Sequence, residues 1–599
     1  MTVVLESRLE APLDGPLDSQ PANPLAAFDA SDGSPGREFA KLVAEAKGVE
    51  EARRRARAPK EREAQQYVDD ARNGRLEQAE ALARANPDSP IAFARLAQVL
   101  HGIGDVDAAV VAARRAMSVS RGGERGPAEA MALFVVARTL VGAGALEEAE
   151  AVLAEIRQPG PWALLSAAIA KSRGDVPAAL ARLGADDSAD AAAFRGYLRL
   201  ETREPQRALA ELRRARKVGG DSPSLLLNLA YAYAWVGSNT KAIRAAHHAA
   251  RLAPFSMAAS FNLASYLRAA GRDREAIEEL HRLRREIGEG QPLVAEALAE
   301  AYCSIGRDRD ALRELRRAEH HHSLAPDAPD LAELRANVAL LQWRLGEKSK
   351  DALVAAIRQQ IEVAGPQVSL VTMLADVAGT PEGVRLARQY YEQLAVEADR
   401  DELVPLLIRL RISEGQLESA ARLAIEFAMA NPLDTAAVRS AVVLQGQILG
   451  EYSAAADFGL SALRRAPGDV MLLNNVAFCL ILAGRLGEAV TLLSGVRAED
   501  PYLFATRGMA AFAQRELEEG LRWYDDAAAA ARKVIVAEGE LESFLRLLRA
   551  NELVAMQELN LVSPRFLEEF GQLVGEPLDW PEDPSFLILR KRLERLPAS

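Results

Sequence analysis

The stretch NLAYAYAWVGSNTKAIRAAHHAARLAP occupies residues 228–254, and NLASYLRAAGRDREAIEELHRL follows it at residues 262–283. The two stretches carry the same kinds of residue at matching positions, one period of about 34 residues apart. The matched positions of the first copy are Asn228, Leu229, Ala230, Tyr233, Gly237, Ala242 and Ala249, and those of the second are Asn262, Leu263, Ala264, Leu267, Gly271, Ala276 and Leu283. The chain therefore contains a repeated module.

Each repeated position meets a packing demand of two antiparallel helices joined by a tight turn. Leu229 and Tyr233 are four residues apart, so they share one apolar face of the first helix. Gly237 lies where the chain must reverse, and glycine takes a positive φ there without a steric cost. Ala242 is small enough to let the second helix lie close to the first. Pro254 cannot continue the second helix, so it ends the module.

The module recurs along most of the chain. Its turn positions are Gly104, Gly144, Gly174, Arg203, Gly237, Gly271, Gly306, Gly346, Gly379, Gly415, Gly450 and Gly484, and a last unit has Gly508, Gly520 and Tyr524. Arg203 stands in a glycine position, which puts that turn in doubt. After Gly346 the pattern slips by one residue before Ala352. The pattern resembles the tetratricopeptide repeat over roughly residues 60 to 530.

This resemblance implies an all-α fold, an α-solenoid in which helix pairs stack into a right-handed superhelix with a concave inner surface. We expect three regions. Residues 1–36 contain prolines and scattered aspartates and are predicted to form a disordered acidic leader. Residues 37–530 form the tetratricopeptide-like array, and residues 531–599 form capping helices and a tail, with an amphipathic helix around Leu541 to Leu553. In the tail, Phe566, Leu567, Phe570, Trp580 and Phe586 are expected to cover the last repeat.

Composition limits the location and the partners. The start has no basic segment followed by an apolar one, and no apolar run is long enough to span a membrane, so we expect a cytoplasmic protein without membrane insertion. Heavy use of alanine and arginine indicates a GC-rich, bacterial genome. The formal net charge of −12 argues against nucleic acid, and the basic run Arg53 to Arg62 is interpreted as a solvated helix face. Cys303 and Cys479 are expected to be buried free thiols.

Signals of catalysis are poor, so we predict a protein that is not an enzyme and has no cofactor. No nucleophile elbow, Walker lysine or zinc-protease helix occurs. The tract His320-His321-His322 is the only metal-like one, and consecutive helical residues point about 100° apart, so three in a row converge only in a loop. Adventitious metal affinity is left open, and no functional metal site is predicted.

The candidate site is a row of asparagines on the first helices. In the family that the pattern resembles, first helices line the concave groove, and Asn228, Asn262, Asn337 and Asn475 precede the signature apolar residue. An asparagine amide offers a donor and an acceptor, so such a row can hold an extended backbone. Ala297 interrupts the row. The alternative is that these asparagines bond neighbouring helices.

Arginines at groove positions form a second set of candidates. Arg95, Arg138, Arg195 and Arg409 occupy these positions and would favour an acidic partner segment. The basic positions of the carboxylate clamp found in chaperone-tail receptors hold Leu227, Phe261 and Leu293 instead, which disfavours that role.

We therefore expect a scaffold or adaptor that binds an extended peptide or helix of a partner protein in its groove. Two alternatives remain open at this stage. One is a regulatory receptor in which a peptide or small ligand changes the superhelical pitch, and the other is a self-assembling structural subunit. The residues indicate neither the partner, the pathway nor the oligomeric state.

Overall fold

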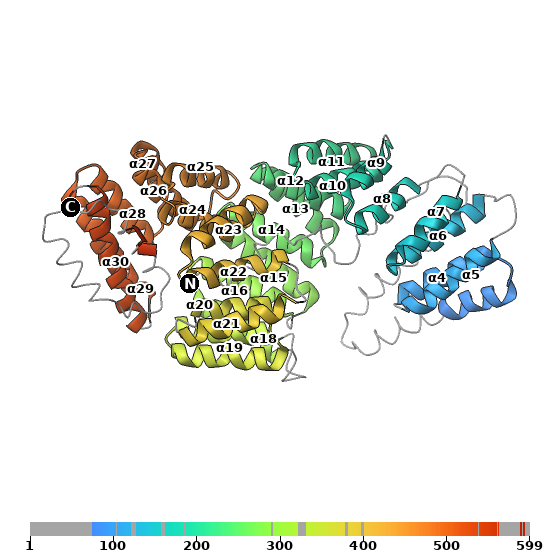
Figure 1. Cartoon of the computed structure of the whole chain (residues 1–599), viewed down its shortest axis with the longest axis horizontal. Coiled ribbons are helices and arrows are strands. Elements are labelled where there is room, and N and C mark those ends of the chain that lie inside the picture. Colours follow the sequence, from blue (N-terminus) through green and yellow to red (C-terminus); the bar gives the residue numbers. More distant parts are fainter. Residues whose placement is uncertain are drawn as a thin grey trace. The chain divides into compact units, whose positions relative to one another are not determined.

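The structure is a computed structural model, and the described residues are almost entirely helical (Figure 1). It describes residues 75–103, 105–120, 127–156, 162–184, 186–288, 291–321, 331–377, 381–396, 400–536, 538–559, 561, 588–589 and 591–592. No strand occurs among these residues, as the all-α prediction requires. The predicted leader, the run from Arg53 to Arg62, and the aromatic residues Phe566 to Phe586 lie outside the described residues.

The chain divides into two compact units, and the boundary between residues 229 and 230 falls inside helix α12 (Pro223–Trp235). The first unit covers residues 15–229. After a helical stretch at residues 75–85 it contains α4 (Pro90–Ile103), α5 (Val106–Val119), α6 (Pro127–Gly142), α7 (Leu146–Glu155), α8 (Trp162–Ser172), α9 (Val176–Leu183), α10 (Ala189–Glu201), α11 (Pro205–Gly219) and the start of α12.

The described part of the second unit begins at residue 230. After the end of α12 it contains α13 (Asn239–Leu252), α14 (Met257–Ala269), α15 (Asp273–Ile287), α16 (Pro292–Ser304), α17 (Asp308–His321), α18 (Ala332–Arg344), α19 (Lys350–Ala364), α20 (Val368–Val377), α21 (Pro381–Leu394), α22 (Arg400–Ser413), α23 (Leu417–Ala430), α24 (Thr435–Gln447), α25 (Tyr452–Leu463), α26 (Val470–Leu482), α27 (Leu486–Ser494), α28 (Pro501–Ala513), α29 (Leu517–Val534) and α30 (Glu538–Glu558). The predicted amphipathic helix is present as α30.

Within each unit the helices form hairpins whose first members also pack on one another. The first helix of a hairpin contacts its own second helix, as in α4 with α5, α16 with α17 and α28 with α29. It also contacts the next first helix, as in α4 with α6, α24 with α26 and α26 with α28. First helices such as α18, α26 and α28 are therefore buried around most of their circumference. A second helix buries one stripe, which in α17 is Ala311, Leu312, Leu315 and Ala318.

The small residue predicted on the second helices is fully buried in most hairpins. The alanines at this position are fully buried, with an exposed fraction of 0%: Ala109, Ala149, Ala179, Ala208, Ala242, Ala276, Ala311, Ala420, Ala455 and Ala489. The expectation for Ala352 was wrong. Ala352 is exposed, and Leu353 takes the buried position because the turn after Gly346 is longer and Ser349 caps α19.

Of the predicted turn glycines, Gly104 and Gly379 lie outside the described residues, and the others up to Gly484 adopt the left-handed conformation. Their φ angles are 77° at Gly144 and Gly174, 75° at Gly237 and Gly484, 72° at Gly271 and Gly346, 71° at Gly306, and 74° at Gly415 and Gly450. At Gly237 the backbone N–H donates to the carbonyl of Ala234 (2.9 Å), and the next N–H, of Ser238, donates to the carbonyl of Tyr233 (2.8 Å). This pair of bonds is a Schellman motif, which satisfies the last carbonyls of the first helix.

At two turns an arginine, and not a glycine, occupies the left-handed position. Arg203 and Arg515 have φ angles of 61° and 66°. The N–H of Arg203 donates to Leu200 (3.0 Å), and that of Glu204 donates to Arg199 (2.8 Å), so the Schellman motif forms here as well. The turn that the sequence left in doubt therefore exists, because hairpin packing compensates for the strain of a left-handed side chain.

We predict that Arg203→Gly stabilises the first unit by up to about 1 kcal/mol, because it removes the steric cost of a left-handed residue. Arg203 is exposed, so the change removes no buried contact. Thermal unfolding followed by circular dichroism measures the effect. The matched control is Gly174→Ala in the preceding repeat, where an added Cβ meets no atom within 4 Å and φ is +77°. This control is expected to lower the unfolding midpoint. A lowered midpoint for Arg203→Gly would contradict the prediction.

In the last hairpin, two glycines serve helix packing rather than the turn. A Cβ on Gly508 of α28 would lie 2.7 Å from the ring of Tyr524, and one on Gly520 of α29 would lie 2.2 Å from the ring of Phe512. The two rings are stacked, with centroids 5.7 Å apart. In this hairpin the rings of Tyr524 and Phe512 fill the space between the two helices, next to the two glycines. Arg515 occupies the turn position.

Within the second unit, segments almost 200 residues apart touch through backbone atoms. The N–H of Gly468, between α25 and α26, donates to the carbonyl of Ala269 at the end of α14 (3.0 Å). Asn239 Nδ2 donates to the carbonyl of Arg464 (3.3 Å). A Cβ on Gly468 would lie 2.0 Å from the backbone nitrogen of Gly271. The contact therefore requires glycine at position 468.

Gly468→Ala is predicted to break this backbone contact and to lower the stability of the second unit by about 1–3 kcal/mol, because rigid backbone cannot move away from the new methyl group. Chemical denaturation gives the midpoint, and hydrogen exchange of the residue 468 amide reports the contact directly. The control is Gly487→Ala in α27, where a Cβ meets nothing within 4 Å. Equal behaviour of the two variants would show that the contact contributes nothing.

Candidate functional site

The four predicted asparagines lie at the same position of their first helices but differ in burial. Asn228 on α12 belongs to the first unit, and the other three belong to the second. Asn262 on α14 and Asn475 on α26 are half-buried, as is Asn228. No described residue forms a hydrogen bond with these three side-chain amides. Their donors and acceptors are therefore available to a ligand or to water.

Asn337 is buried, whereas a residue that binds a ligand in the predicted groove must be exposed. Its side chain in α18 is only 4% exposed, and its Oδ1 accepts no hydrogen bond from a described residue. It is buried because α18 packs on almost every side. Asn474, which sequence reasoning did not single out, has a similar environment: it is 8% exposed and its Oδ1 is also without a partner among the described residues.

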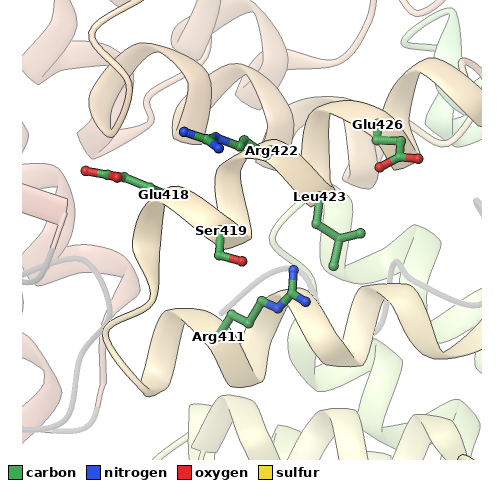
Figure 2. Close-up of a pocket in the computed structure, with 6 residues that line it drawn as sticks. All are labelled: Arg411, Glu418, Ser419, Arg422, Leu423 and Glu426. Carbon is green, nitrogen blue, oxygen red and sulfur yellow. The ribbon is translucent and has the colours of Figure 1, made fainter.

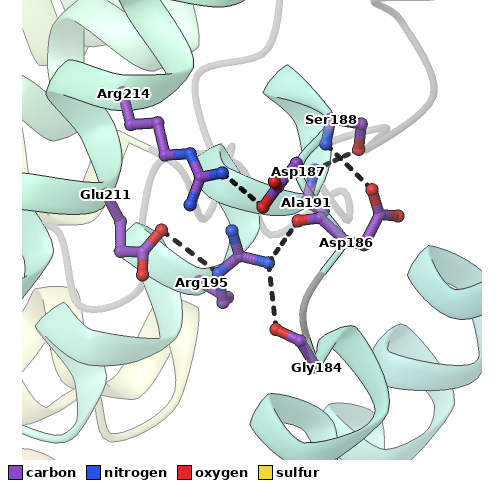
Figure 3. A network of polar contacts seen from close by, with 8 residues as sticks. All are labelled: Gly184, Asp186, Asp187, Ser188, Ala191, Arg195, Glu211 and Arg214. Carbon is purple, nitrogen blue, oxygen red and sulfur yellow. Dashed lines mark hydrogen bonds and ion pairs between the residues drawn. The ribbon is translucent and has the colours of Figure 1, made fainter.

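Arg195 was expected to face a groove, but it holds a loop inside the first unit (Figure 3). Its side chain is 6% exposed. Nε donates to Glu211 Oε2 (3.1 Å), and Nη1 donates to the carbonyl of Asp186 (2.7 Å). Arg195 thus ties α11 to the loop between α9 and α10, and it is not available to an acidic partner. Arg95 on α4 is half-buried.

Arginines on other first helices are also used internally, as ion pairs between neighbouring repeats. Arg268 of α14 pairs with Glu300 of α16 (2.5 Å), at a sequence separation of 32 residues. Arg409 of α22 pairs with Asp376 of α20 (2.9 Å). Each pair joins two first helices one repeat apart, so a sequence spacing near the repeat length was a signal that could have identified these pairs.

We predict that Arg195→Ala destabilises the first unit by about 3 kcal/mol, because it removes charge-assisted hydrogen bonds from a buried loop. Thermal unfolding and hydrogen exchange of residues 184–191 measure the effect. The control is Arg214→Ala, whose pair with Asp187 is 45% and 74% exposed and should contribute less than about 1 kcal/mol. Similar losses for the two variants would contradict the structural role of Arg195.

The hairpin of α22 and α23 carries a shallow hollow of about 370 Å³ (Figure 2). Its lining is Arg411, Glu418, Ser419, Arg422, Leu423 and Glu426. In Figure 2, Arg411 of α22 and Leu423 of α23 point toward the gap between the helices, whereas Arg422 points away from it. The lining combines both signs of charge with a hydroxyl and an apolar side chain.

Residues near the C-terminus lie against the first helices of the second unit. Arg592 Nε and Nη2 donate to the two carboxylate oxygens of Glu558 (3.2 and 2.6 Å), and Nη1 donates to Asn551 Oδ1 (2.8 Å). The guanidinium carbon lies 4.7 Å from the ring centroid of Phe478 on α26. Lys591 pairs with Glu418 (3.4 Å), which also lines the hollow. Sequence reasoning missed the contacts with Phe478 and Glu418 because those partners are far apart in sequence. The pair of Arg592 with Glu558 spans 34 residues, which is close to the repeat length.

The cysteines and the histidine tract are unremarkable as chemical groups. Cys303 and Cys479 are both free thiols, and burial raises the pKa of each to about 12. His320 and His321 lie in the last turn of α17, and His322 lies outside the described residues. Among the residues that the structure describes, no three His, Cys, Asp or Glu side chains lie close enough to share a metal ion.

Every helix in the described part is too short or too polar to cross a membrane.

Among known proteins, this chain is similar to solved structures but matches no sequence family. No family model matches the chain, and no curated protein matches it by sequence. One similar solved structure is that of the APC/C hetero-tetramer Cut9-Hcn1, with 13% identity and a TM-score of 0.47, covering 86% of this chain and 96% of that chain.

Two further similar structures cover less of this chain. MamA AMB-1 has 22% identity and a TM-score of 0.24 over 28% of this chain and 94% of its own. A tetratricopeptide repeat protein from Parabacteroides merdae ATCC 43184 has 16% identity and a TM-score of 0.29 over 42% of this chain and 96% of its own. The recurring left-handed turns, the fully buried alanines and the paired helices make this chain an α-solenoid of tetratricopeptide-like hairpins.

Proposed function

We propose that this protein is a scaffold that binds a segment of a partner protein through side chains on its first helices. The observations that carry this proposal are the half-buried amides of Asn228 in the first unit and of Asn262 in the second, each at the same position of its own first helix and without a described partner. A polypeptide backbone presents an N–H and a C=O at every residue, and an asparagine amide complements both.

The surroundings of these amides support recognition of a backbone more than recognition of a charged group. Around Asn262 the arginine of the same helix, Arg268, already pairs with Glu300, and further along Arg409 pairs with Asp376. Because these pairs neutralise Arg268 and Arg409, neither arginine is available to an acidic segment. We therefore propose a partner segment held by amide hydrogen bonds and apolar contact, and not the acidic segment that the arginine positions suggested.

Asn228→Ala/Asn262→Ala is expected to lose at least one specific partner that the wild-type chain captures from native lysate, while helicity is unchanged. Alanine removes the amide groups but keeps a good helix former in the half-buried position. Quantitative mass spectrometry of cross-linked complexes measures partner retention, and circular dichroism measures helicity.

The control is Gln206→Ala/Gln359→Ala, which removes two exposed amides of similar chemistry from the second helices α11 and α19. It should retain every partner. If both double variants retain the same partners as the wild type, the asparagine positions are not the binding determinants. The cytoplasmic location and the absence of a nucleic-acid partner remain predictions that fractionation and a nuclease-treated capture can test.

A further inference from the structure

The C-terminal residues of the chain make a set of contacts that resembles a bound ligand. Leu589 and Arg592 are each 3% exposed, and Ile588 packs against the apolar core of the second unit. The contacts reach three separate hairpins or helices: Glu418 at the start of α23, Phe478 of α26, and Glu558 at the end of α30. A short segment thus joins elements from three parts of the array.

We propose that this surface is a docking site for a basic amphipathic segment of a partner protein that carries an arginine. Ile588, Leu589, Lys591 and Arg592 occupy it until such a segment displaces them. The site is defined by Glu418, Phe478, Asn551 and Glu558. This proposal rests on the proposed function in its general form, that first helices bind partner segments, and it names the chemistry of one such segment.

The site is built for arginine. Three nitrogens of the Arg592 guanidinium have acceptors, two on the Glu558 carboxylate and one on Asn551. The paired bonds to one carboxylate use the planar fork of the guanidinium, which the single ammonium group of lysine cannot reproduce. Phe478 covers one face of the guanidinium, as in a cation–π contact. The position therefore selects arginine over other basic residues.

The Arg592 contact has the features of a specific binding site and not those of a cap on the end of a solenoid. A cover for the end of a solenoid needs only an apolar inner face and a polar outer face. A buried ion pair adds little stability over apolar packing, because removing both charges from water is costly. Arg592 and Glu558 are nevertheless 3% and 9% exposed. A buried arginine with one face on an aromatic ring is typical of the residues that dominate binding interfaces.

Two features indicate that the bound segment can be exchanged. The flanking pair of Lys591 with Glu418 is 32% and 58% exposed, and such pairs contribute little. Asn474, one helical turn before Phe478 on the same face of α26, is 8% exposed and its Oδ1 lacks a donor among the described residues. A buried acceptor without a donor is costly. A longer partner segment that donates to Asn474 would bind better than the chain's own residues.

The negative charges of the site favour a positively charged segment. Glu418 and Glu558 both face basic side chains of the segment, and the chain as a whole carries a formal net charge of −12. The present occupant places two apolar residues, Ile588 and Leu589, before Lys591 and Arg592. A partner segment with the same order of apolar and basic residues fits this chemistry.

A labelled peptide with the sequence of residues 584–599 tests the proposal against the full-length chain. A tethered segment competes at an effective concentration that reaches the millimolar range for short tethers. The wild-type chain should therefore bind the peptide at least about tenfold more weakly than Arg592→Ala, whose own segment has lost its anchor. Fluorescence anisotropy measures both affinities. Adding Glu558→Gln to Arg592→Ala should remove the gain, because glutamine has one oxygen acceptor in place of two.

Arg522→Ala is the matched control, since Arg522 is an exposed arginine on the second helix α29. It should bind the peptide as weakly as the wild type. Equal affinity of wild type and Arg592→Ala would overturn the proposal, as would peptide binding that is insensitive to Glu558→Gln. Loss of cooperative unfolding in Arg592→Ala would also overturn it, because the segment would then be a permanent part of the core. A wild-type dimer in light scattering that Arg592→Ala abolishes would make the occupant a second copy of the chain.

The peptide assay and the capture experiment address different helices. Capture tests α12 and α14, whereas the peptide tests α26 and α30. A negative capture with a positive peptide result would restrict binding to the C-terminal surface, and the opposite result would retain the scaffold function and remove the exchangeable segment.

Discussion

The close approach of two antiparallel helices is the constraint on which the rest of this structure depends. At the point of contact the second helix carries an alanine whose exposed fraction is 0%, and the chain reaches that contact through a residue in the left-handed conformation. At these alanines a larger side chain would separate the helices and remove dispersion contacts along both. In α19 the longer turn places Leu353 at the buried position instead. The last hairpin solves the same problem with Gly508 and Gly520, which accept the rings of Tyr524 and Phe512.

Burial of the first helices follows from this arrangement and restricts what the protein can offer to a partner. A first helix packs against its own second helix and against neighbouring first helices, so polar groups on it must find partners within the fold or remain half-exposed. The arginines Arg268 and Arg409 have partners within the fold, one repeat away. Asn262 and Asn475 remain half-exposed, so we assign a binding role to amides and not to charges.

Contacts between distant repeats give the second unit features that no single module contains. The backbone bond between Gly468 and Ala269 joins loops that belong to hairpins far apart in the chain. Arg592 binds Asn551 and Glu558 of α30 and also lies over the ring of Phe478 on α26, so a C-terminal segment joins two helices that are separated in the chain. Because each such contact involves only a few residues, it adds specificity to an array that would otherwise be held by neighbour-to-neighbour packing alone.

The sequence alone was sufficient to predict the all-α hairpin repeat, most of its turns and its buried alanines, since these depend on interactions within about 34 residues. The turn at Arg203 and the shift from Ala352 to Leu353 were harder to predict, because packing there overrides local preference. Only the tertiary structure decided that Arg195 binds a loop, that Asn337 is buried and that Arg592 meets Glu558. The partners are near in sequence, because Glu211 is 16 residues from Arg195 and Glu558 is 34 residues from Arg592. The outcomes depend on which side chains the packing of neighbouring helices brings within hydrogen-bonding distance, and a repeated pattern of residue types does not specify that distance.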